Sequence, residues 1–121
     1  SPELVEQRAI DERIDSVFYS DEYAAAIVRN TTGEYGSRLE VYKKDGTHVL
    51  SKEFNFEYTH ADFDGDLIIL YNDDSCRIYN MSGTEKFDAT FDFPVSRIRK
   101  GRFPGTLVVT GPQQMRELKL H

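Results

Sequence analysis

Residues 67–80 read LIILYNDDSCRIYN, and this stretch decides the fold. Its two halves, 67–72 and 75–80, are short runs rich in aliphatic, β-branched and aromatic residues, and Asp73-Asp74 separates them. Runs of this length and composition, bounded by turn residues, are typical of β-strands. The stretch therefore predicts two neighbouring strands joined by a short turn.

The same pattern continues in both directions along the chain. Further apolar runs are separated by residue pairs typical of hairpin turns, in which glycine accepts the positive φ that a tight antiparallel connection needs. These pairs are Asp45-Gly46, Asp64-Gly65, Ser82-Gly83 and Pro104-Gly105. Helical periodicity is absent except over Glu3–Arg13, whose apolar residues fit a helix or a strand equally well. We therefore predict an all-β chain.

The chain repeats itself, with a period of about 40 residues. A shift of 37 residues places Val41 on Ile78, Tyr42 on Tyr79, Gly46 on Gly83, Phe54 on Phe91 and Phe56 on Phe93. A shift of 40 residues places Phe63 on Phe103, Gly65 on Gly105, Leu67 on Leu107 and Ile78 on Leu118. One unit therefore recurs, and a loop at 31–36 lengthens its first copy.

Each unit divides into four strands, A to D. The predicted strands are 14–19, 24–29, 38–43 and 48–56 in the first unit, 59–63, 67–72, 75–80 and 85–93 in the second, and 96–100, 106–110 and 114–120 in the third. We treat 1–121 as a single domain with a separate D strand at 3–10, units at 14–56 and 59–93, and an incomplete unit at 96–120.

A four-stranded unit of this length is typical of a β-propeller blade. Three blades cannot enclose an axis, because closed propellers have about four to eight. We expect either further blades in a longer protein or two copies of the chain that complete a six-bladed ring, and hence a homo-oligomer. The separate strand at 3–10 suits a closure in which it completes the unfinished third sheet.

Residues 74–80 resemble the end of strand C in blades of the WD-type and quinoprotein-like superfamily. An acidic turn precedes alternating apolar positions, and Tyr79-Asn80 stands where that pattern has Trp-Asp. The strand pattern is also similar to that of a bacterial family of membrane-anchored, propeller-like proteins of unknown function. That resemblance implies a transmembrane helix before the blades and a tethered, extracytoplasmic location. It implies no activity. The chain opens Ser1-Pro2 without an initiating Met, so we expect a piece of a longer protein.

Composition limits the possible partners. The 121 residues carry a formal net charge of −6, the opposite of what phosphate binding requires, so we expect no nucleic-acid partner. No apolar run is long enough to span a bilayer, so we expect no direct membrane contact from this segment. Cys76 is the single cysteine and occupies a core position matched by Leu39 one unit earlier, which predicts a buried, inert thiol.

Two groups of residues could bind ions. Asp62, Asp64 and Asp66 alternate like calcium ligands, but their glycine stands at the wrong position for an EF-hand loop, so we interpret them as a solvated turn. No two of His48, His60 and His121 lie at ligand spacing, so we predict neither a metal site nor a cofactor.

The basic cluster Arg97, Arg99, Lys100 and Arg102 either binds an anionic ligand or acidic partner, or forms a solvated edge that pairs with the surplus acids. We favour the solvated edge. The recurring aromatic residues at 54–58 and 87–93 predict contacts between neighbouring sheets rather than a stacking platform for a ligand.

No catalytic constellation is present in the sequence, so we predict a non-enzymatic binding, sensing or protein-interaction module. Alternating strand direction places the D–A and B–C loops on one face, and variable loops on a rigid scaffold often bind partners. The expected partner contacts are Glu57, His60, Asp73, Asp74, Arg97 and Gln113. The alternative is a fragment of a propeller enzyme or quinoprotein-like protein whose catalytic residues lie outside this chain.

Overall fold

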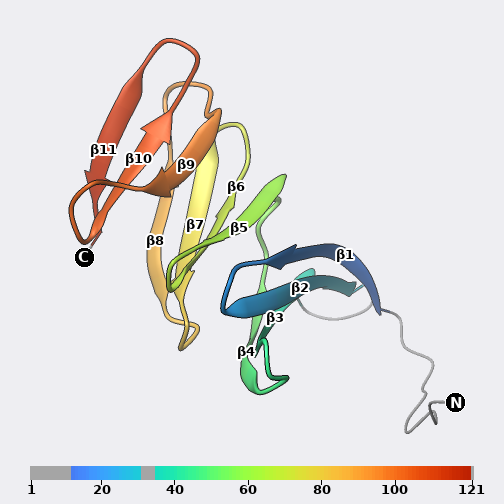
Figure 1. The fold of residues 1–121 in the computed structure, drawn as a ribbon. Coiled ribbons are helices and arrows are strands. Elements are labelled where there is room, and N and C mark those ends of the chain that lie inside the picture. The colour runs from blue at the N-terminus through green and yellow to red at the C-terminus, as the bar shows by residue number, and fades with distance from the viewer. Residues whose placement is uncertain (1–11, 31–34, 121) are drawn as a thin grey trace, which may run out of the picture.

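The structure, a computed structural model, describes residues 12–30 and 35–120, which form three antiparallel sheets (Figure 1). Sheet I contains β1 (Glu12–Tyr19), β2 (Tyr23–Asn30), β3 (Ser37–Lys43) and β4 (His48–Phe54). Sheet II contains β5 (His60–Asp64), β6 (Leu67–Tyr71), β7 (Ser75–Asn80) and β8 (Glu85–Thr90). Sheet III contains β9 (Arg97–Lys100), β10 (Thr106–Thr110) and β11 (Met115–Lys119). Within each sheet the strands follow one another in sequence order.

The prediction of an all-β chain built from four-stranded antiparallel units is confirmed. Every strand predicted from residue 14 onward is present, and its ends differ from the prediction by at most three residues. The predicted strand at 3–10 lies outside the described residues. The described part of the chain contains no helix that could cross a bilayer.

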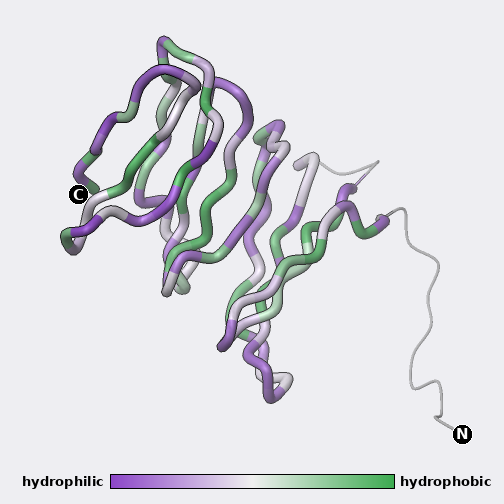
Figure 2. Tube along the Cα trace, turned by 45° about the horizontal axis from the view of Figure 1, so that its top comes forward, coloured by the Kyte–Doolittle hydropathy of each residue, from purple (hydrophilic) through white to green (hydrophobic). Residues whose placement is uncertain are grey.

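The three sheets stack face to face in an open row, and sheet II lies between the other two (Figure 1). Strands of sheet II present apolar side chains on both faces, as expected for a sheet covered on both sides. On β6, Ile68 and Leu70 pack against sheet I, whereas Ile69 and Tyr71 pack against sheet III. Two separate hydrophobic cores result, and the tube in Figure 2 shows the hydrophobic residues concentrated along the middle strands.

The 37-residue repeat holds in three dimensions. Phe54 and Phe91 are both buried, at 3% and 8% exposure, each in the core between its own sheet and the next. The ladder that joins strands C and D is irregular at the same place in both units, after Val41 and after Ile78. Gly46 and Gly83 complete the equivalent turns, with φ of 92° and 84°. The predicted contact between sheets at these aromatic positions is confirmed.

The 40-residue repeat is wrong by one residue in strands B and C of the third unit. Ile68 pairs with Tyr79, and Leu107 pairs with Leu118, so the equivalent residues lie 39 apart. Phe103 is 59% exposed in the turn before β10, whereas Phe63 is buried in β5. Because side chains alternate along a strand, a shift of one residue exchanges the two faces of the sheet. The turn of the third unit is longer, and this displaced the sequence match.

A cation–π contact recurs between consecutive sheets. The Arg77 guanidinium lies 5.1 Å from the ring centre of Phe56, and that of Arg116 lies 5.0 Å from the ring centre of Phe93. The two arginines are 39 residues apart and the two phenylalanines 37 apart, so both pairs occupy equivalent positions. Each joins strand C of one sheet to the segment that follows strand D of the preceding sheet, and such contacts typically stabilise by about 0.5–2 kcal/mol.

Tyr58 anchors the connection between sheets I and II. Its hydroxyl donates a hydrogen bond to a carboxylate oxygen of Asp15 and lies 2.8 Å from Ser16 Oγ. Arg29 also lies 3.6 Å from the Asp15 carboxylate. Burial and the hydrogen bond to Asp15 raise the pKa of Tyr58 to about 12. The hydrogen bond from Tyr58 outweighs burial and lowers the pKa of Asp15.

We expect Tyr58→Phe to destabilise the fold by about 1–2 kcal/mol near neutral pH, because it removes a hydrogen bond to a charged acceptor. The pKa of Tyr58 rises from 10.0, its unperturbed value, to about 12 in the folded protein. The hydrogen bond therefore contributes its full stability below about pH 10, and this contribution is lost as the pH rises through 12. The difference between wild type and variant should therefore shrink between those two pH values. Urea titrations across this range measure it, with Tyr35→Phe, at an exposed position, as the control. A pH-independent difference would contradict the assignment.

Candidate binding groove

The first strand of each sheet has one edge without a hydrogen-bonded neighbour in the described residues, because β1, β5 and β9 end the strand order. Two hollows lie along these edges. One, of about 300 Å³, lies between β1 and β5 and is lined by Val17, Phe18, His60 and Tyr71 among others. The other, of about 430 Å³, lies between β5 and β9. The unpaired edges of the three sheets thus border the two hollows.

We call the larger hollow the arginine groove. It is lined by Asp62, Phe63, Asp64, Ile69, Tyr71, Arg97, Ile98, Arg99 and Lys100. Buried Ile69, Tyr71 and Ile98 form an apolar base. The basic residues come from β9, and the two carboxylates come from the facing strand β5.

The register of β9 separates its cations onto two sides. Arg97 and Arg99 lie opposite Thr110 and Val108, on the face turned away from sheet II, whereas Lys100 lies opposite buried Leu107 on the face toward it. The free edge of β9 runs between the two sides. A segment placed along that edge would be flanked by two guanidinium groups and an ammonium group, which are strong donors to carboxylates.

Within the described residues, Arg97, Arg99 and Lys100 have no ion-pair partner. The nearby carboxylates accept backbone hydrogen bonds instead. Asp64 Oδ2 accepts from the Lys100 backbone N–H at 2.5 Å, and Asp62 accepts from the N–H of Phe63 at 2.9 Å. These three cations are exposed along an edge strand, and within the described residues no ion pair joins them to the surplus acids.

Two of the predicted contact residues, His60 and Arg97, lie on either side of Tyr71. The His60 ring stacks on Tyr71, with ring centres 4.8 Å apart and an angle of 8° between the planes. Tyr71 lines both hollows, and His60 and Arg97 each line one of them. The spacing of these residues in the sequence did not indicate that a single aromatic ring would join them.

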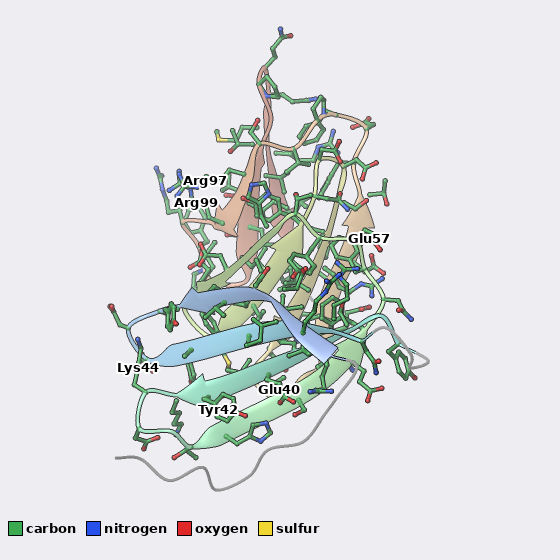
Figure 3. All side chains as sticks on the ribbon, turned by 90° about the vertical axis from the view of Figure 1, so that its right-hand side faces the viewer. Glu40, Tyr42, Lys44, Glu57, Arg97 and Arg99 are labelled. Carbon is green, nitrogen blue, oxygen red and sulfur yellow. The ribbon has the colours of Figure 1, made fainter. Side chains whose placement is uncertain are left out.

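The other predicted contact residues lie elsewhere on the surface. Figure 3 shows Glu57 well separated from Arg97 and Arg99, which lie together. The backbone oxygens of Asp73 and Asp74 accept hydrogen bonds from Val95 and Phe91, so their turn supports the connection to sheet III. Gln113 borders a separate hollow of about 270 Å³ beside Phe93 and Pro94. The structure therefore does not gather the six predicted residues into one site.

The sequence gives no sign that Tyr71 lines a groove, because it reads only as a strand residue. The sequence offers Arg99 and Lys100 as part of a basic cluster that binds an anion or forms a solvated edge, but not as predicted contact residues. The available signal was the alternation Arg97-Ile98-Arg99, in which a core residue is flanked by two cations on the opposite face. Which strand faces β9 across the groove depends on the stacking of the sheets and is not encoded locally.

Glu40, His48 and Ser51 form a cluster on β3 and β4. His48 Nε2 lies 3.1 Å from Glu40 Oε1 and 3.2 Å from Ser51 Oγ, and the Ser51 hydroxyl donates to the same Glu40 carboxylate. Burial raises the pKa of Glu40, but hydrogen bonds from Ser51, His48 and Arg38 outweigh it and lower the pKa. A nucleophile needs a base that holds its proton while another group orients the base. Here one imidazole nitrogen faces both partners, so the cluster does not have that geometry.

The sequence predictions for Cys76 and the aspartate run can also be placed. Cys76 is fully buried, and burial raises the pKa of its thiol to about 12, as predicted for an inert core residue. Asp64 pairs with Leu67 across the turn at Gly65-Asp66, as predicted for a hairpin. The residues that the structure describes contain no group of three or more acidic, histidine or cysteine side chains placed to hold a metal ion.

The protein is therefore an all-β protein of stacked, blade-like antiparallel sheets. A groove with three cations on one side lies at the unpaired edges of two of these sheets. The chain belongs to DUF5711, a family of unknown function, whose model matches residues 1–120. No curated protein matches the chain. The family carries no assigned activity, and its description does not connect the chain to WD-type propellers.

Proposed function

We propose that this domain is a non-enzymatic binding module of the propeller type, and that the arginine groove holds an acidic, extended segment of a protein partner. One observation carries the proposal: Arg97, Arg99 and Lys100 line the β9 side of a hollow of about 430 Å³ without an ion-pair partner among the described residues. The three residues form a cluster of positive charge on a chain whose formal net charge is −6. A tethered, extracytoplasmic location remains part of the proposal and rests on the resemblance alone.

An extended segment fits this groove better than a compact anion. Apart from the Lys100 N–H, which already donates to Asp64, the unpaired edge of β9 can hydrogen-bond to an added strand, a common mode of peptide recognition. The two arginines are two residues apart on the same face of β9, so they match alternate side chains of an added strand. Asp62, on the β5 side, would repel acidic side chains and direct the segment toward β9.

The test is binding of a fluorescein-labelled decapeptide of alternating glutamate and valine, measured by fluorescence anisotropy at low ionic strength. We expect Arg97→Ala/Arg99→Ala to weaken binding at least about tenfold, since a charge-assisted hydrogen bond contributes about 1.5–3 kcal/mol and 1.4 kcal/mol is a factor of ten. Added salt should weaken binding to the wild type, because the pairs are exposed.

The matched control is Lys43→Ala/Lys86→Ala, which removes two positive charges from β3 and β8, strands that do not line the groove. Compared at an ionic strength of about 0.15 M, where the Debye length is about 8 Å, it should change the affinity less than about twofold, because exposed charges far from the ligand are screened. Equal binding by the arginine double variant, or preference for the matching lysine–valine peptide, would refute the proposed ligand class.

A further inference from the structure

The two ends of the row of sheets differ in character. By register, the outer face of sheet III carries Arg97, Arg99, Thr106, Val108, Thr110, Met115, Glu117 and Lys119. A polar outer face of this kind is what a terminal, capping repeat presents to water. The outer face of sheet I is different: over β1 and β2 it is apolar, with Ile14, Val17 and Tyr19 exposed at 67%, 49% and 63%.

Residues on the outer face of sheet I are equivalent to residues that are buried on sheet II. Register places Tyr19, Ala24, Ala26 and Tyr42 where sheet II has Phe63, Ile68, Leu70 and Tyr79. On sheet II those four side chains are between 0% and 9% exposed, because sheet I covers them. The outer face of sheet I is therefore equivalent to the face of sheet II that sheet I covers.

We propose that this face is covered by the same face of a second copy of the chain, related by a two-fold axis. A head-to-tail contact would instead set it against the polar outer face of sheet III, and closure of a ring through both ends would bury Arg97 and Arg99. Like faces are the better match, because the apolar area is present on only one end of the row. An isologous contact of this kind is the commonest arrangement of homo-oligomers.

The face is complementary to itself in shape and charge. Its small residues alternate with larger ones in the register: Ala24 lies between Tyr19 and Tyr42, and Ala26 lies between Val17 and Glu40, so larger side chains of one copy can pack over the alanines of the other. On β3, Arg38 and Glu40 lie side by side with their charged groups 2.7 Å apart, and Lys44 lies over the Tyr19 ring. Figure 3 shows Glu40, Tyr42 and Lys44 along this face. Both signs of charge therefore lie on this face.

The test is the mass in solution, by light scattering after size exclusion at micromolar concentrations. We expect the wild type to have twice the protomer mass of 14.0 kDa. Val17→Lys/Ala26→Glu should give the protomer mass. These two positions are direct cross-strand partners, so the two opposite charges stabilise the pairing of β1 with β2. The same charges disrupt the apolar contact between the two copies.

The matched control places one charge on the other end of the row. Val108→Glu lies opposite Arg99 on the outer face of sheet III and should leave the mass doubled. Far-UV circular dichroism and melting curves confirm that each variant is folded. The proposal is overturned if the wild type is monomeric over the whole concentration range. It is also overturned if Val108→Glu halves the mass and Val17→Lys/Ala26→Glu does not. Arg97→Ala/Arg99→Ala should not change the mass, so the result is independent of the groove.

Discussion

Phe91→Ala is expected to lower the free energy of unfolding by about 3–5 kcal/mol, the range for loss of a buried aromatic side chain. The Phe91 ring is 8% exposed, and its centre lies 5.7 Å from that of Phe93. Both rings belong to the core between sheets II and III, with Ile69 and Ile78 of sheet II. Truncation leaves a cavity that rigid strands on either side cannot fill. Equilibrium unfolding in urea measures the loss.

Phe103→Ala is the matched control, because Phe103 is 59% exposed and belongs to neither core. It should change stability by less than about 0.5 kcal/mol, as surface substitutions usually do. If Phe91→Ala unfolds the protein outright, Phe91→Leu gives the smaller, measurable loss. Equal effects of the two alanine substitutions would show that the sheets do not stack through Phe91.

The positions of the strands could be predicted because the signals for them are local. Short apolar runs and turn residues act over a few residues, and most of the described strands carry them. The equivalence of Phe54 and Phe91 could also be predicted, because the turns at Gly46 and Gly83 have the same length. Matching residues therefore keep the same face of the sheet.

The register of the third unit could not be predicted in the same way. Gly65 and Gly105 both complete turns with positive φ, at 61° and 75°, and this drew the alignment to a shift of 40. The turn in the second unit joins Asp64 directly to Leu67 over two residues. In the third, the first ladder pair is Lys100 with Leu107, so the loop is longer and the faces exchange. A matching glycine fixes the position of a turn but does not fix which side chains point inward.

The groove was only partly predictable for a related reason. The sequence places Arg97 near a loop, and the structure places it along the arginine groove. Glu57 and Gln113 also lie near loops but not in this groove. What brings Arg97 toward Tyr71 is the stacking of sheet III on sheet II, a contact between residues far apart in the chain. Loop position alone does not carry that information.

Leu107→Ala should cost about 2–5 kcal/mol, whereas Val108→Ala, one residue later on the same strand, should cost less than about 1 kcal/mol. Leu107 is fully buried against sheet II, and Val108 lies on the outer face of sheet III between Arg99 and Glu117. The two substitutions remove similar apolar groups from opposite faces of one strand. The difference between their free energies of unfolding in urea therefore shows which face of β10 is buried. A large loss at Val108 would mean that another sheet covers this face. The polar end of the row would then be an interface, and the dimer would have to form through both ends rather than through sheet I alone.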